Sequence, residues 1–126
     1  MSFWEKKFSH VPHEKFPERD YKIEDAIGML ELAHSMKEDD PYILDSVGWA
    51  YYLINDFINA EKYMQRAIRI MPNDPTVNDH YGDILWSMDR KIEAKYYWKG
   101  VLNIKETEDK MKKNIKDKLI EGLKKS

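Results

Sequence analysis

Residues 41–74 read PYILDSVGWAYYLINDFINAEKYMQRAIRIMPND, and residues 75–106 continue as PTVNDHYGDILWSMDRKIEAKYYWKGVLNIKE. The two stretches match at a spacing of 34 residues, which places Pro41 over Pro75. The same spacing links further identical residues: Gly48 with Gly82, Asp45 with Asp79, and Ala26 with Ala60 and Ala94. So many coincidences at one fixed period indicate a repeat protein, in which each repeat is one small structural unit.

Each repeat predicts a pair of helices. In the first complete repeat, apolar residues recur at helical spacing over residues 41–54 and again over residues 57–70. Asn55 and the aspartate after it separate the two helices, because Asn tolerates the left-handed backbone that ends a helix. Gly48 and Ala60 lack bulk where the helices cross, so we expect the two backbones to approach closely there.

The start of the array is incomplete. Residues 23–38 predict the second helix of a repeat whose first helix is missing, because Pro12 and Pro17 interrupt the preceding segment. We expect residues 1–22 to be irregular, apart from a short helix over residues 2–9. The aromatic side chains of that helix would then fold back over the gap: Phe3, Trp4 and Phe8.

The end of the array is expected to be closed by a capping helix. The second repeat predicts helices over residues 75–88 and 91–105, and residues 107–124 predict one more, with Thr107 as its N-cap. The apolar face of this last helix consists of Met111, Ile115, Leu119 and Leu123. Such a helix covers the last repeat with one face and contacts water with the other.

The composition fits a single folded domain over residues 1–126. Hydrophobic residues make up 42% of the chain, too many for a disordered protein, and the net charge of −2 provides no general attraction to nucleic acid. The absence of cysteine excludes a disulfide framework and a zinc–thiolate site, and we expect no cofactor. No apolar run reaches about 20 residues, and no signal-peptide pattern opens the chain, so we expect no membrane insertion. A cytoplasmic location follows, or a periplasmic one if the chain is part of a longer exported protein.

The pattern of large and small residues in the first complete repeat resembles the tetratricopeptide (TPR) repeat, through Leu44, Val47, Gly48, Tyr51, Ala60, Met64, Ala67 and Pro72. Residues 78–101 resemble it more loosely, with Asn78 where the family prefers a large apolar residue. The strings DSVGWAYY and NDHYGDILW are similar to tandem-repeat proteins of Gram-negative bacteria. The resemblance, over about residues 20–106, implies an all-α fold. It would be a right-handed superhelix of antiparallel helix pairs, with two and a half repeats plus the C-terminal capping helix.

In that family the first helices of the pairs line a concave groove that binds extended peptides or partner helices. The resemblance implies a groove lined by Tyr42, Asp45, Trp49, Tyr52 and Leu53 in one repeat, and by Thr76, Asp79, His80, Asp83 and Trp86 in the next. Half-exposed aromatic side chains are typical of binding hot spots, and the three aspartates would make the lining negative. Family members that clamp the carboxylate tail of heat-shock chaperones use Lys, Arg and Asn at these positions, so such a tail is not the expected ligand. The alternative is that these aspartates are solvated and bind nothing.

We therefore expect a scaffold or adaptor that binds another protein or peptide, preferably one with basic residues, and not an enzyme. A second hypothesis is self-assembly, because the incomplete first repeat leaves an open end through which copies could stack or exchange helices into a homo-oligomer. A third is an enzyme or metal site at Asp79, His80 and Asp83, which lie three or four residues apart on one helix. No third or fourth ligand lies near them in sequence, so we expect no metal.

Overall fold

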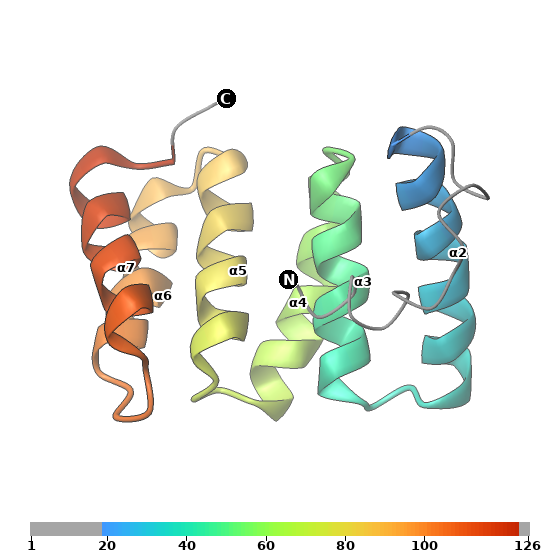
Figure 1. Cartoon of the computed structure of the whole chain (residues 1–126), viewed down its shortest axis with the longest axis horizontal. Coiled ribbons are helices and arrows are strands. Elements are labelled where there is room, and N and C mark those ends of the chain that lie inside the picture. The colour runs from blue at the N-terminus through green and yellow to red at the C-terminus, as the bar shows by residue number, and fades with distance from the viewer. Residues whose placement is uncertain (1–18, 124–126) are drawn as a thin grey trace.

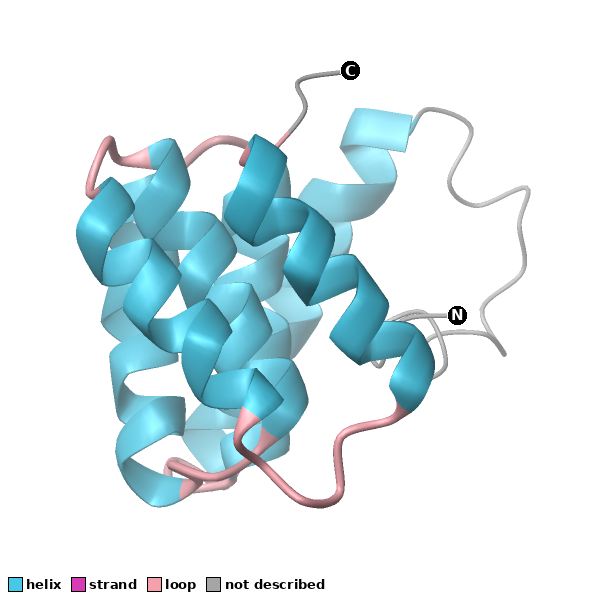
Figure 2. Ribbon diagram, turned by 90° about the vertical axis from the view of Figure 1, so that its left-hand side faces the viewer, coloured by secondary structure: helices cyan, strands magenta, loops and turns pink. Residues whose placement is uncertain are grey.

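The computed structural model describes residues 19–123, with side chains from Ile23 onward. Within this range the regular elements are α2 (Arg19–Met36), α3 (Pro41–Leu53), α4 (Phe57–Ile70), α5 (Pro75–Ser87), α6 (Lys91–Leu102) and α7 (Asp109–Glu121). They follow one another along the long axis in chain order (Figure 1) and are joined by loops without any strand in this range (Figure 2). No helix in the described range is long and apolar enough to cross a membrane. The short helix expected over residues 2–9 lies outside the described residues.

The helix bounds repeat with the sequence. Both ends of α3 recur 34 residues later in α5, and both ends of α5 recur 34 residues later in α7. The starts of α4 and α6 keep the same spacing. Because α7 also packs against α6, as α5 packs against α4, it takes the place of a third first helix in register with the array.

Local sequence determines where most of these helices begin and turn. Asp40 and Asp74 each precede a proline at the first helical position, and their carboxylates accept backbone N–H groups of the following turn, at 2.9 Å from Tyr42 N and 2.9 Å from Val77 N. The turn inside each pair contains a residue with a left-handed backbone at the equivalent position: Asn55 with φ 65° and Asp89 with φ 61°. The predicted break after the first helix of each pair is therefore where the chain reverses.

Several expected boundaries differ from the structure, and helices α2, α3, α5 and α7 end one to three residues before the expected ends. Helix α2 begins at Arg19, one turn before the expected start at Ile23. Helix α6 ends at Leu102 and not at residue 105. Thr107 is not the N-cap of α7, a position taken by Glu108, because its buried hydroxyl donates to the Val101 carbonyl at 2.8 Å and so fastens the loop to the end of α6.

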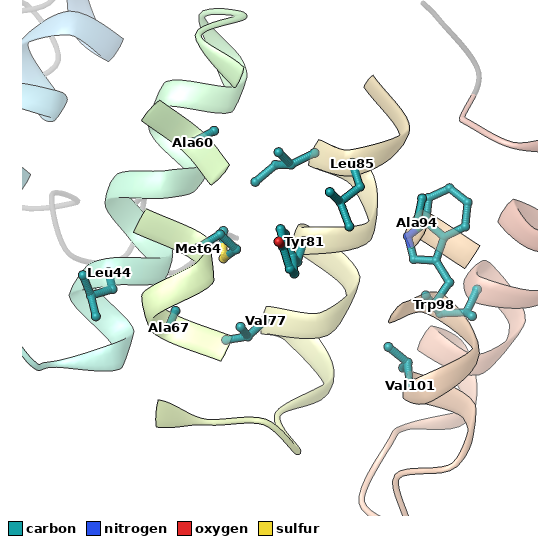
Figure 3. Close-up of a cluster of buried hydrophobic side chains, with 12 residues drawn as sticks. Leu44, Ala60, Met64, Ala67, Val77, Tyr81, Leu85, Ala94, Trp98 and Val101 are labelled. Carbon is teal, nitrogen blue, oxygen red and sulfur yellow. The ribbon is translucent and has the colours of Figure 1, made fainter. Parts of the chain in front are cut away.

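The core lies between the helix pairs, and small residues allow its close packing. Met64 of α4 and Tyr81 of α5 point toward one another, while Trp98 of α6 lies fully buried beside α5 (Figure 3). A Cβ atom on Gly48 would lie 3.1 Å from the Ala60 carbonyl oxygen, and one on Gly82 would overlap the Trp98 indole. The expected close crossing at Gly48 and Ala60 is confirmed, and the structure shows that Gly82 allows the same in the second pair.

We expect Gly82→Ala to lower the free energy of unfolding by about 1–3 kcal/mol, because the new methyl group must displace the fully buried Trp98. Gly28→Ala in α2 is the matched control, since none of the described atoms lies within 4 Å of its built Cβ. The control should gain about 0.5–1 kcal/mol from the removal of a mid-helix glycine. Urea unfolding followed by circular dichroism measures both, and equal effects of the two substitutions would contradict this account.

Candidate binding site on the first helices

The surface formed by α3, α5 and α7, here called the first-helix face, carries the residues expected to line a groove. Helices α3 and α5 are in direct contact along this face. Because the helices share one register, the position of Tyr52 in α3 recurs as Trp86 in α5 and as Ile120 in α7. The expected lining therefore extends by one helix beyond the two repeats from which it was inferred.

Three rings form a stack that joins α3 to α5. The Trp49 ring stacks on Tyr52 within α3, with centroids 4.6 Å apart, and on His80 of α5, with centroids 4.0 Å apart. Trp49 and Tyr52 are half-buried, so part of each ring remains at the surface. Stacked aromatic pairs contribute about 0.5–1.5 kcal/mol beyond their buried area, which makes the stack a structural link between the two helices.

Asp45 is buried, and its partner is His80. The Nδ1 atom of His80 lies 2.8 Å from Oδ1 of Asp45, and since a carboxylate only accepts, Nδ1 is the donor. Burial opposes a charge on the imidazole, but Asp45, with the more distant charges of Asp79 and Asp83, outweighs burial and raises the pKa of His80. The negative charge of Asp45 is thus paired with His80 within the chain.

Lys118 of α7 holds the other two aspartates. Its Nζ atom lies 2.7 Å from Oδ1 of Asp79 and 2.9 Å from Oδ1 of Asp83. The same Asp83 oxygen accepts the Trp98 indole N–H at 3.2 Å. Burial disfavours the ammonium charge, but Asp83 and Asp79 overcome this and raise the pKa of Lys118. One lysine therefore joins α7 to α5 at the centre of the first-helix face.

Asp83 has an unusual proton affinity. Burial of its carboxyl and the nearby Asp79 charge raise the pKa of Asp83 to about 6, against the opposing effect of Lys118. Because this folded-state pKa lies above the ordinary value of 3.8, folding favours the protonated form between these two values. The first-helix face consequently contains one carboxyl that titrates close to neutral pH.

Trp86 is also engaged by its own chain. Its ring stacks on Trp98 with centroids 5.4 Å apart, and Lys91 Nζ lies 5.0 Å from its centroid. Gly122, with φ 71°, packs its backbone so closely on Trp86 that a Cβ atom there would overlap the ring. Trp86 therefore anchors the end of α7, while Tyr42, 56% exposed, and Thr76 are exposed at the other ends of their helices.

The structure separates the cluster considered as an enzyme or metal site. Asp79 and Asp83 converge on Lys118, whereas His80 faces Asp45. Among residues 23–123, no group of three or more His, Asp or Glu side chains is placed to hold a metal ion. What this part of the face presents is a set of internal ion pairs.

Sequence reasoning missed the contribution of α7. A pocket of about 340 Å³ lies between α5 and α7, and the carboxylate residues Asp79, Asp117 and Glu121 line it together with Lys118. Asp117 occupies the register position of Trp49 and Asp83, so continuing the 34-residue spacing into the last helix would have found it. The amphipathic pattern of α7 predicted only that one side packs on the last repeat, and its other side was interpreted as solvated surface.

The titration of Asp83 is testable through Asp83→Asn. A raised pKa adds stability that is full below about pH 4 and is lost as the pH rises through about 6. The free energy of unfolding of the wild type minus that of Asp83→Asn should therefore fall between pH 4.5 and pH 7.5, on the order of 2 kcal/mol. Urea unfolding at both pH values measures the difference. A difference that is constant or increases with pH would show that this carboxyl is not perturbed.

Comparison with known proteins supports the assignment of a helical repeat. A TPR repeat-containing protein of Pseudomonas aeruginosa is 35% identical over 66 residues, which are 52% of this chain and 11% of that protein. Protein bimA of Emericella nidulans is 29% identical over 76 residues, which are 60% of this chain and 9% of that protein. The chain thus spans about a tenth of the length of these curated relatives. No family model matches it.

Solved structures include a similar fold. The first TPR domain of Spaghetti (RPAP3), bound to the HSP90 peptide SRMEEVD, matches with a TM-score of 0.70 and 15% identity, over 90% of this chain and 86% of that one. At this identity the match concerns the fold. The 34-residue period and the stacked helix pairs give the chain an all-α solenoid fold, and in both features it is similar to tetratricopeptide repeat proteins.

Proposed function

We propose that this chain is a protein-interaction module, and not an enzyme, and that its first-helix face binds a polypeptide with basic residues. The observation that carries the proposal is the pocket between α5 and α7, where three carboxylate residues surround a single lysine. The solved structure of the similar RPAP3 domain with a bound peptide supports a binding function of this kind. Asp45 and Asp83, which were expected to line an acidic groove, are buried. The acidic contact would instead be made by the pocket residues Asp79, Asp117 and Glu121.

The charge of this pocket favours a cationic side chain. Asp79, Asp117 and Glu121 carry three negative charges, and Lys118 supplies one positive charge that already contacts Asp79. Asp117 and Glu121 are exposed, so a partner lysine or arginine can reach them without disturbing the Lys118 ion pairs. A carboxylate tail, by contrast, would meet repulsion here.

Apolar and aromatic side chains beside the pocket would supply contact area. Ile120 on α7 is 83% exposed although it holds the register position of Tyr52 and Trp86. Trp49 and Tyr52 continue the surface onto α3. Aromatic anchors next to a charged rim are typical of interaction hot spots, so a partner that combines basic and apolar residues fits the face.

We expect Asp117→Asn with Glu121→Gln to weaken binding of basic peptides several-fold while leaving helicity unchanged, because both residues are exposed. The probes are dodecapeptides selected on the wild-type protein from a phage-displayed random library and measured by fluorescence anisotropy. Glu24→Gln with Asp25→Asn on α2 is the matched control, since it removes the same charge from exposed positions elsewhere. Selected peptides without Lys or Arg enrichment, or equal binding by the two double variants, would refute the proposal.

We also propose self-assembly, because α2 exposes an apolar stripe at the open end of the array. Met29, Leu32 and Met36 recur at helical spacing and are 37%, 65% and 77% exposed. A second copy that pairs through this stripe would cover surface that the incomplete first repeat leaves uncovered.

Light scattering at about 50 µM, where a complex of micromolar affinity is populated, should show a dimer or larger species. Leu32→Glu with Met36→Glu should return the chain to a monomer. Ile58→Glu with Ile92→Glu, at positions 78% and 88% exposed on α4 and α6, should not. A monomeric wild type would exclude this second function and leave peptide binding unaffected.

A further inference from the structure

A second open surface lies between α4 and α6, the second helices of the two complete repeats. This α4–α6 cleft encloses about 610 Å³ and is larger than the pocket between α5 and α7. Its walls come from the end of α4 and the turn that follows it, from the last two turns of α6 and the loop after them, and from Asn78 of α5. None of its lining residues belongs to the acidic pocket of the first-helix face.

The preceding cleft, between α2 and α4, shows what the repeat places in this space. There Arg66 of α4 reaches across, with its guanidinium 3.3 Å from Nε2 of His34, 3.2 Å from the Glu38 carbonyl oxygen and 3.7 Å from Oδ1 of Asp39. The chain thus fills its first cleft with a side chain of its own.

The α4–α6 cleft lacks this side chain. At the 34-residue spacing Arg66 corresponds to Gly100 of α6. The three residues that Arg66 contacts correspond to residues that line the open cleft: Ile68, Pro72 and Asn73. The cleft is therefore open because one position of the repeat carries a glycine in place of an arginine.

Helix packing does not require this glycine. A Cβ atom built on Gly100 would contact only the Asn78 side-chain oxygen, at 3.9 Å, whereas one on Gly82 would overlap a buried indole. Glycine in a helix is less stable than alanine, and here close packing does not explain it. What the glycine does provide is the open space of the cleft.

The lining combines an apolar floor with a cationic rim. Ile68, Pro72 and Ile104 supply apolar surface, while Arg69 and Lys99 supply two positive charges from opposite walls. No Asp or Glu lines the cleft. Within residues 23–123, neither cation forms an ion pair with a carboxylate. On a chain of net charge −2, this local charge is opposite in sign to the whole.

We propose that the α4–α6 cleft binds an acidic peptide segment that inserts an apolar side chain over Gly100 and places its carboxylates against Arg69 and Lys99. The inserted side chain takes the space that Arg66 fills in the preceding cleft. Guanidinium and ammonium groups form charge-assisted hydrogen bonds with carboxylates, which fixes the sign of the partner. Two cations are too few for a nucleic-acid backbone, whose binding needs an extended basic surface. The chain would then have two peptide sites of opposite charge preference.

The test uses a defined probe, a pool of acetylated and amidated pentapeptides of sequence Ala-Glu-Xaa-Glu-Ala with Leu, Met or Phe at the central position. Titrated into the 15N-labelled full chain, the pool should shift the amide signals of Gly100 and Asn73 in a saturable way below about 1 mM, the weak end of specific peptide affinity. A pool with Lys in place of Glu should not. The Asp117→Asn, Glu121→Gln variant should bind the acidic pool as the wild type does, which separates this site from the first-helix face.

Arg69→Gln with Lys99→Gln should weaken the binding by about tenfold or more, since each charged hydrogen bond contributes about a factor of ten. Lys62→Gln with Lys95→Gln is the matched control, because it also removes one cation from each of the two helices, at positions outside the cleft. Gly100→Leu should abolish binding by filling the cleft, and Gly100→Ala keeps the steric test available if the leucine variant does not fold.

Absence of saturable shifts with the acidic pool would overturn the proposal. So would affinities unchanged in the Arg69, Lys99 double variant, or equal binding of the acidic and lysine pools. Shifts confined to α5 and α7 would place acidic binding on the other face and would equally refute it.

Discussion

The indole of Trp98 lies directly on the backbone of Gly82, and the arrangement of the last three helices depends on this contact. Only a residue without a side chain leaves room for a fully buried ring between α5 and α6. The indole N–H of the buried ring donates a hydrogen bond to Asp83, whose carboxylate also accepts one from Lys118 of α7. The same ring stacks on Trp86, and Trp86 packs against Gly122 at the end of α7. The absence of a side chain at Gly82 therefore supports both the packing of α5 against α6 and the ion pairs of the first-helix face.

Much of the fold could be predicted because its causes are local. Proline after Asp40 and the left-handed Asn55 act within a few residues, so they indicate helix starts and turns. The small Gly48 contacts the second helix of its own repeat, so its recurrence at the repeat spacing indicates the crossing. The boundaries that were wrong depend on distant or competing partners. Thr107 suits an N-cap, but the Val101 carbonyl, which also accepts the Ile104 backbone N–H, offers its hydroxyl a buried alternative.

The chemistry of the candidate site was harder to predict, although its residues do share one face of the helix array. Asp45 bonds to His80 across 35 residues, and Asp79 to Lys118 across 39. The repeat predicts that such residues share a face, but it does not say which carboxylate lies next to which cation. Lys118 is one of several lysines in the last helix, and its sequence neighbours do not distinguish it from the solvated ones. Pairing depends on rotamers and burial, which follow only from the packed helices.

The register of the first helices has a consequence for the length of the array. Gly48 and Gly82 each stand where a first helix receives its second helix, and the next member of this series is Lys116 of α7, which is exposed. A lysine side chain at that point occupies the space that a closely crossing helix would need. A further helix could therefore pack on α7 in the same geometry only if this side chain moved aside. At this register position the chain carries glycine where a second helix packs closely, and lysine on the first helix that has no such partner among the described residues.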